Sequence, residues 1–300
     1  MKKIIAISLL LLLVFTLSAC GAEEEETSMQ LIIAGKDTTE QLIVDQMLLL
    51  LIEEKTDHTA VVSTNNYLTS YDLAEGAEKG DVHIYVDYDG SMYENALELE
   101  WADAEKTDVT NLVRNTFKDE LALTVKDAIG FSGGYTVYIT DEKLESLGTP
   151  ENLSALVEQA PDLVIGMEQS FYDRADAYDA FALFYGFAFH AAQTYQEKDG
   201  FAALMAGDID LLVGETTSPY YSLYDLNAIS DDKGFFLPAI ALPVVSSEVL
   251  TDYPEIGDAI TLTKKLITTK TMSSLVAKVE LEGMEIADVA RDFLRARSLI

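Results

Sequence analysis

The sequence predicts an α/β protein of two lobes, each a mainly parallel sheet flanked by helices. Short apolar segments, several of them bounded by glycine, alternate with helical patterns along most of the 300 residues. Such alternation is typical of parallel sheets with helices on both faces. About 280 residues remain once a leader is removed, which is enough for two domains of ordinary size.

Strands and helices alternate through the first third of the chain. A strand ends at Gly35, and a helix capped by Thr38 or Thr39 follows it. The predicted strands are 31–34, the segment that starts at Val61, and 82–86, and a second helix covers 70–79. The buried side of the first helix is predicted to carry Leu42, Ile43, Gln46, Met47, Leu50 and Leu51.

The rest of the chain repeats this order and then becomes helical. Residues 254–296 predict three helices, separated by breaks near Thr268 and Gly283. Because open α/β sheets bind ligands at the carboxyl ends of their strands, we expect a ligand between the two lobes. The predicted strands are 135–140, 163–167, 209–213 and 240–244, and the predicted helices between them are 151–159 and 175–185.

The N-terminus predicts a bacterial lipoprotein signal. Two lysines precede the apolar stretch 4–17, and the small residues before Cys20 suit cleavage. We expect residues 1–19 to be a signal peptide and 20–28 to be a lipidated cysteine with a charged tether. The alternative, an uncleaved membrane helix, needs roughly 20 apolar residues. The mature protein is therefore predicted outside the cytoplasm, attached to the cell membrane through its lipid anchor.

Composition excludes several classes of partner. The chain has 52 Asp and Glu against 20 Lys and Arg, a net charge of −32, which disfavours nucleic acid and anionic lipid surfaces. The bulk of this charge is interpreted as a solvated acidic surface. Cys20 is the only cysteine, so no disulfide forms within the chain. We expect a monomer without a cofactor.

Five segments, in order along the mature chain, resemble the substrate-binding lipoproteins of osmoprotectant ABC importers, those for glycine betaine, carnitine and choline. No single segment is specific, but together they extend over about 200 residues in the family's order. The segments are 35–41 (GKDTTEQ), 80–91 (GDVHIYVDYDGS), 174–176 (RAD), 207–210 (GDID) and 231–238 (DDKGFFLP).

The resemblance implies a type II periplasmic-binding-protein fold with two crossovers between the lobes. Residues 29–132 and 240–300 would form lobe 1, and residues 133–239 would form lobe 2. It also implies a function without catalysis, in which the chain delivers a small zwitterionic or cationic solute to an ABC permease on a separate chain. An alternative within the same fold is a receptor that binds another amine or has no transport role.

The resemblance places candidate ligand-binding residues at both ends of the ligand. Family members surround a quaternary ammonium with tyrosine rings, which attract cations. Tyr88 and Tyr135 match two of these positions. Lys36, Ser91 and Arg174 match the polar end, where the ligand's carboxylate would lie.

Two positions depart from the family's tyrosine box. Glu215 and Ala239 stand where relatives have aromatic residues. Two lost ring faces, at up to about 2 kcal/mol each, weaken betaine binding by about a thousandfold. Because a carboxylate favours N–H donors, Glu215 predicts a ligand less methylated than glycine betaine, or a bulkier cation.

Each candidate also has a purely structural interpretation. Tyr88 and Tyr135 would then pack at strand ends, and Arg174 would pair with a neighbouring aspartate. Under this interpretation Lys36 and Glu215 are solvated loop residues.

Enzyme chemistry is weakly supported. Residues 130–134 satisfy the G-x-S-x-G pattern of serine hydrolases, with His190 downstream. That motif requires a strand, a turn and then a helix, whereas the residues after Gly134 alternate like a strand. The three histidines lack the spacing of metal ligands, so we expect no metal.

Overall fold

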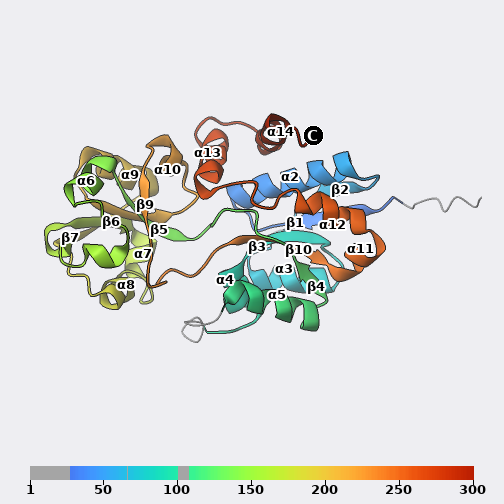
Figure 1. Cartoon of the computed structure of the whole chain (residues 1–300), viewed down its shortest axis with the longest axis horizontal. Helices are drawn as coiled ribbons and strands as arrows, with labels where there is room; N and C mark the ends of the chain where they lie inside the picture. Colours follow the sequence, from blue (N-terminus) through green and yellow to red (C-terminus); the bar gives the residue numbers. More distant parts are fainter. Residues whose placement is uncertain (1–27, 66, 101–107) are drawn as a thin grey trace, which may run out of the picture.

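Two five-stranded sheets form the cores of two lobes that lie side by side along the molecule (Figure 1). The computed structural model describes residues 28–65, 67–100 and 108–300. Cys20 and the predicted signal peptide lie outside these residues. The α/β class with two lobes is confirmed.

The first sheet has the strand order β2-β1-β3-β10-β4. Strand β1 runs parallel to β2 and β3, whereas β10 runs antiparallel to both of its neighbours. The strands are β1 (Gln30–Ala34), β2 (Thr59–Val62), β3 (Ile84–Tyr88), β4 (Leu123–Val125) and β10 (Ala241–Ser246).

The second sheet has the order β7-β6-β8-β5-β9. Strand β6 runs parallel to β7 and β8, and β5 runs antiparallel to β8 and β9. Only one strand of each sheet is reversed, so both sheets are mainly parallel. In each case the reversed strand is the first one after a crossover. The strands are β5 (Tyr135–Ile139), β6 (Val164–Glu168), β7 (Ala191–Tyr195), β8 (Leu211–Glu215) and β9 (Asn227–Ile229).

Helices cover both faces of each sheet (Figure 1). With the first sheet lie α2 (Thr39–Lys55), α3 (Ser70–Glu78), α4 (Asp89–Ser91), the π-helical segment Met92–Ala96, α5 (Val109–Glu120), α11 (Ser247–Asp252), α12 (Pro254–Thr261), α13 (Thr269–Glu280) and α14 (Ile286–Ala296). With the second lie α6 (Asp141–Ser146), the 3-10 turns Leu153–Leu156 and Ala160–Asp162, α7 (Gln169–Asp173), α8 (Tyr178–Tyr185), α9 (Glu197–Ala206) and α10 (Pro219–Leu223).

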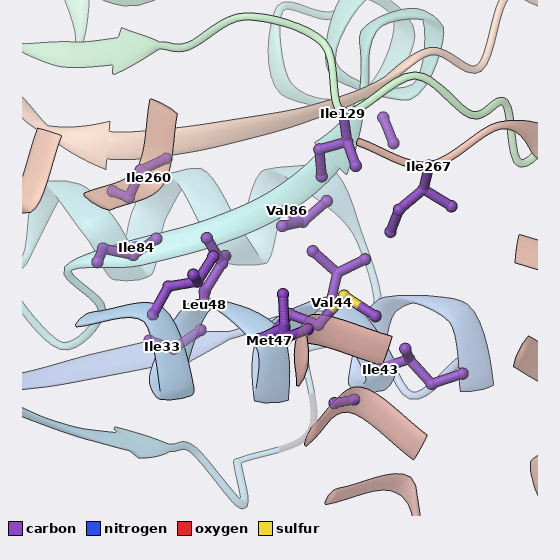
Figure 2. Close-up of a cluster of buried hydrophobic side chains, with 14 of the residues drawn as sticks. Ile33, Ile43, Val44, Met47, Leu48, Ile84, Val86, Ile129, Ile260 and Ile267 are labelled. Carbon is purple, nitrogen blue, oxygen red and sulfur yellow. The ribbon is translucent and has the colours of Figure 1, made fainter. Parts of the chain in front are cut away.

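Strand β3 shows how the first core is built. All five of its residues are buried, as expected for a strand covered on both faces. Ile84 and Val86 face α2, where they pack with Met47 and Leu48 (Figure 2), and Tyr85 packs on the opposite face with α3 and α5. Each large apolar side chain buried in this way stabilises the fold by about 1.5–3 kcal/mol.

The two crossovers pair with each other. Ser132 and Ile240 form an antiparallel bridge, and the Gly133 amide donates a 2.9 Å hydrogen bond to the Ala239 carbonyl. Buried Asp89 holds the second crossover, because its Oδ1 accepts a 2.9 Å bond from the Ile240 amide. The lobes are therefore joined by a short two-stranded ribbon.

Some predicted elements differ from the observed ones. The predicted helix 151–159 contains one short 3-10 turn, Leu153–Leu156, which Asn152 caps, and a second turn, Ala160–Asp162, follows it. Pro161 has no amide hydrogen for a continuing helix. On α2 the buried side includes Gln41 and Asp45, whereas Leu42 is only half-buried. The three helices predicted near the C-terminus are confirmed as α12, α13 and α14.

Candidate functional site

A cavity of about 210 Å³ opens between α2 and α13 on one side and the second sheet on the other. Two of its glutamates end parallel strands, Glu168 in β6 and Glu215 in β8, and Glu197 begins the helix after β7. The cavity thus lies at the carboxyl ends of the strands, where open α/β sheets bind ligands. Its five glutamates are Glu40, Glu168, Glu197, Glu215 and Glu280.

Four of these carboxylates accept hydrogen bonds from neighbouring hydroxyl groups, the longest being the 3.5 Å bond from Ser170 to Oε2 of Glu168. Oε1 of Glu40 accepts a 2.8 Å hydrogen bond from Tyr88, and Oε1 of Glu280 accepts a 2.6 Å bond from Thr39. Ser218 donates a 2.7 Å bond to Oε1 of Glu197. Each of these bonds engages one carboxylate oxygen and fixes the direction of the side chain.

Helix α13 brings lobe 1 to the cavity. It lies between the two sheets and packs against α10 (Figure 1). The buried Ser273 hydroxyl donates a 2.6 Å bond to the Ser218 carbonyl and accepts a 2.9 Å bond from the Ser222 amide. This contact places the end of α13, with Glu280, over the cavity.

Aromatic side chains form much of the remaining wall. Tyr135, Phe171, Tyr195 and Phe201 line the cavity, and the Tyr135 and Phe171 rings lie 5.3 Å apart. The faces of such rings attract cations.

The cavity is strongly electronegative. Desolvation in the cavity, together with the charges of the four neighbouring glutamates, raises the pKa of Glu215 to about 7, although its side chain is partly exposed. Burial also raises the pKa of Glu197, although the Ser218 hydroxyl opposes this shift. The residues that line the cavity include no lysine, arginine or histidine. The site is suited to a cation.

Two of the predicted site residues meet in this cavity. Tyr135 and Glu215 are partners across β5 and β8, so their backbones are adjacent at the cavity wall. The Tyr138 hydroxyl donates a 2.6 Å bond to the Glu215 carbonyl, which fixes the end of β8.

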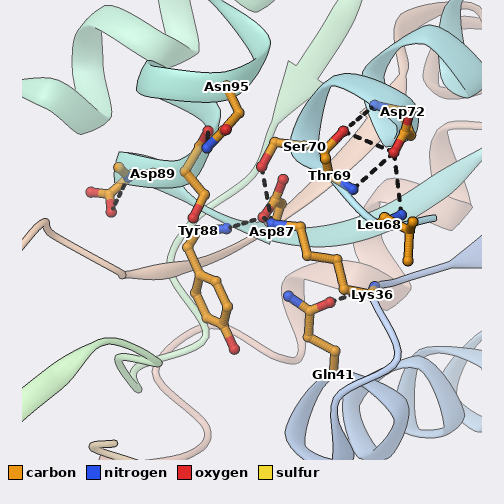
Figure 3. Close-up of polar contacts among 12 residues, drawn as sticks. Lys36, Gln41, Leu68, Thr69, Ser70, Asp72, Asp87, Tyr88, Asp89 and Asn95 are labelled. Carbon is orange, nitrogen blue, oxygen red and sulfur yellow. Dashed lines mark hydrogen bonds and ion pairs between the residues drawn. The ribbon is translucent and has the colours of Figure 1, made fainter. Parts of the chain in front are cut away.

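Lys36 and Tyr88 are not part of the cavity lining. Both lie beside Asp87 (Figure 3). The Lys36 ammonium contacts Oδ1 of buried Asp87 at 2.7 Å and donates a 3.0 Å bond to Ser70. It also lies 6.0 Å from the centre of the Tyr88 ring. Tyr88 is buried and reaches the cavity only through its bond to Glu40.

Arg174 and Ser91 also lie outside the lining. Arg174 is exposed, and its guanidinium donates two 3.0 Å hydrogen bonds to the carboxylate of Asp176. Ser91 is half-buried at the end of α4. Ala239 is buried in the crossover, where its Cβ would lie 3.1 Å from a Cβ added at Gly134.

The hydrolase motif lacks its required context. Gly134 is followed directly by strand β5, and the Ser132 carbonyl accepts a hydrogen bond from the Thr216 hydroxyl within the crossover. Among the described residues, no group of three or more His, Cys, Asp or Glu side chains has the arrangement of a metal site. Within the same residues no helix is long and apolar enough to cross a bilayer.

Sequence reasoning missed four of the five glutamates. Glu168 had a usable signal, because it directly follows the predicted strand 163–167. No sequence signal pointed to Glu197, because the strand before it, β7, was not predicted. Strand β7 lies at the edge of the sheet and its residues do not alternate between apolar and polar. Glu40 and Glu280 reach the cavity only through the packing of α2 and α13.

Residues 29–296 match the family described as the substrate-binding domain of ABC-type glycine betaine transport systems, OpuAC. A solved glycine betaine/carnitine/choline ABC transporter structure superposes with a TM-score of 0.80 at 30% identity, over 90% of this chain and 99% of that one. The apo form of YehZ from Escherichia coli gives a TM-score of 0.77 at 19% identity, over 90% and 99%.

Curated relatives are more distant in sequence. The ergothioneine transport permease/ergothioneine binding protein EgtU of Helicobacter pylori is 27% identical over 74% of this chain and 39% of its own length. The carnitine transport binding protein OpuCC of Listeria monocytogenes is 28% identical over 61% of this chain and 59% of its own. The chain thus spans less than two thirds of these relatives' lengths. The match over residues 29–296, together with the shared fold, shows that the chain belongs to the OpuAC family of substrate-binding domains.

Proposed function

We propose that this chain is an extracytoplasmic solute-binding lipoprotein that delivers a small organic cation to an ABC importer. The observation that supports this most is the cavity in which five carboxylates and several ring faces surround a space without a basic side chain. A cation gains Coulomb attraction from the carboxylates and cation–π attraction from the rings. The proposed function is binding and release, with no bond made or broken.

The proposed binding residues differ in how directly they act. Tyr135 and Glu215 would touch the ligand, and Tyr88 would act through Glu40. Lys36 and Arg174 would bind an anionic end of the ligand only after breaking their ion pairs with Asp87 and Asp176. Ser91 would contact that end only if it moved toward the cavity together with them. We therefore propose a cation less methylated than glycine betaine as the preferred ligand.

We further propose that lobe 1 (29–132 and 240–300) and lobe 2 (133–239) close on the ligand about the paired crossovers. Residues of both lobes line the cavity, so closure would bring their carboxylates to the same cation. Small-angle scattering should show contraction when ligand is added. A bound ligand that leaves the scattering profile unchanged would contradict closure.

A thermal-shift screen tests the function itself. The mature chain is heated with glycine betaine, choline, carnitine, ergothioneine, ectoine and a set of amines. A ligand at a hundred times its dissociation constant adds about 2.7 kcal/mol of stability. Stabilisation by one of these cations is expected. If none of these compounds stabilises the protein, the proposal fails and the alternative, a receptor without a transport role, replaces it.

A further inference from the structure

We infer that the cavity takes a linear organic dication with primary ammonium ends, a diamine or polyamine, in preference to a betaine. This inference rests on the proposed solute binding and names the substrate class. Its basis is the placement of the five carboxylates on two opposite walls of one cavity.

The two walls come from different lobes. Glu40 in the first turn of α2 and Glu280 at the end of α13 form the lobe 1 wall. Glu168, Glu197 and Glu215 form the lobe 2 wall. A single ammonium brings one positive charge to these carboxylates, whereas a dication brings two and can place one at each wall.

No side chain of the lining carries a positive charge that would balance a carboxylate ligand. A betaine or carnitine carries one carboxylate, which needs a cationic or N–H partner. Lys36 is engaged by Asp87 and Arg174 by Asp176, both outside the lining. A ligand carboxylate placed in the cavity would face five glutamates and be repelled.

The chemistry of the two ligand types also differs at the nitrogen. A primary ammonium donates three hydrogen bonds, and charge-assisted bonds to carboxylates are the strongest of these. A trimethylammonium donates none. The rings of Tyr135, Phe171 and Phe201 lie in the same cavity and offer apolar surface to the methylene chain between two ammonium groups.

Titration calorimetry with three compounds tests the inference: butane-1,4-diamine, butylamine and glycine betaine. The mature chain is used at low salt and about pH 8, where Glu215 is ionised. The diamine is expected to bind at least about tenfold more tightly than butylamine. Equal binding of the diamine and butylamine, or weaker binding of the diamine, would overturn the inference.

Variants on the two walls sharpen the test. Glu280→Gln removes charge from the lobe 1 wall and Glu168→Gln from the lobe 2 wall, and each should lower the ratio of diamine to butylamine affinity by at least about fivefold. Glu54→Gln, at an exposed position of α2, is the matched control and should leave the ratio unchanged. Thermal melts check that every variant folds. If both wall variants fold and the ratio of diamine to butylamine affinity stays at the wild-type value in each, the two-wall arrangement is contradicted.

The outcomes separate this inference from the proposed function. Tight binding of glycine betaine without binding of the diamine would overturn the inference of a dication ligand but would agree with the proposed solute-binding function. If none of the three compounds binds in calorimetry and none stabilises the protein in the thermal-shift screen, the dication inference and the proposed function are both overturned.

Discussion

The Tyr88 hydroxyl donates a 2.8 Å hydrogen bond to Oε1 of Glu40, so a tyrosine that the resemblance places at the ligand is joined to a carboxylate of the cavity. Tyr88 is buried and T-shaped against Phe131, with ring centres 6.4 Å apart. The ring packs behind the cavity wall, and under the proposed function a bound cation would contact the carboxylate that the Tyr88 hydroxyl holds.

Tyr88→Phe should therefore lower stability. A hydrogen bond to a charged acceptor contributes about 1.5–3 kcal/mol, and the half-buried position of Glu40 favours the lower end. Urea unfolding of wild type and variant measures the change. Tyr71→Phe, at an exposed tyrosine on α3, is the control. A Tyr88→Phe variant as stable as wild type would show that this bond contributes nothing.

Gly133→Ala should be destabilising because of Tyr88. A Cβ at position 133 would lie 2.4 Å from Cζ of that ring, and overpacking of this kind costs about 1–3 kcal/mol. The loss should shrink when Gly133→Ala is combined with Tyr88→Ala, which removes the clashing ring. Additive losses in this double-mutant cycle would contradict the contact.

Asp45 should make stability depend on pH. Its side chain is fully buried, neither carboxylate oxygen has a hydrogen-bond partner, and burial raises its pKa from 3.8 to about 8. The folded state thus keeps the proton that the unfolded state loses. The stability linked to this group is complete below about pH 4, falls by about 1.4 kcal/mol per pH unit above that, and levels off above about pH 8.

Asp45→Asn removes this titration. In urea unfolding at about pH 5, 7 and 9, the free energy of unfolding of the variant relative to wild type should increase as the pH rises to about 8 and should stay constant above that. Asp258→Asn, at an exposed position on α12, is the control. A constant difference between Asp45→Asn and wild type across these pH values would mean that Asp45 titrates normally.

Cation affinity should rise with pH through the titration of Glu215. Because the pKa of its carboxyl is about 7, it is mostly protonated at about pH 6 and ionised at about pH 8. Only the ionised form attracts a cation, so butane-1,4-diamine should bind more tightly at the higher pH and release protons on binding at the lower. Calorimetry in two buffers of different ionisation heat measures both. Glu215→Gln should lose most of this dependence, and an unchanged profile would point to another group.

Cys20→Ala tests the anchor. The change removes the thiol that would carry the lipid, so the protein should appear in the medium or periplasm instead of the membrane fraction. Thermal melts of the released protein should match those of the mature wild type. A variant that stays with membranes after a salt wash would contradict the lipoprotein assignment.

The sequence by itself determined the α/β class, the order of the main strands and the family. These follow from local patterns, such as the apolar segment at 82–86 and the strand that ends near Glu215, and from segments read in order along the chain. Glu215 was predicted through the family resemblance, at a position where relatives have an aromatic residue.

Only the tertiary structure decided which charges share the cavity. Glu40 and Glu280 are far apart in sequence, and both reach it because α2 and α13 pack beside the second lobe. The partner of Lys36 was decided in the same way, since Asp87 was only one of many acidic residues. A neighbouring aspartate was already expected as a partner for Arg174, and the structure has Asp176 in that place. The buried position of Asp45 was likewise hidden, because α2 is apolar on most sides and its residues alone do not show which side faces the sheet.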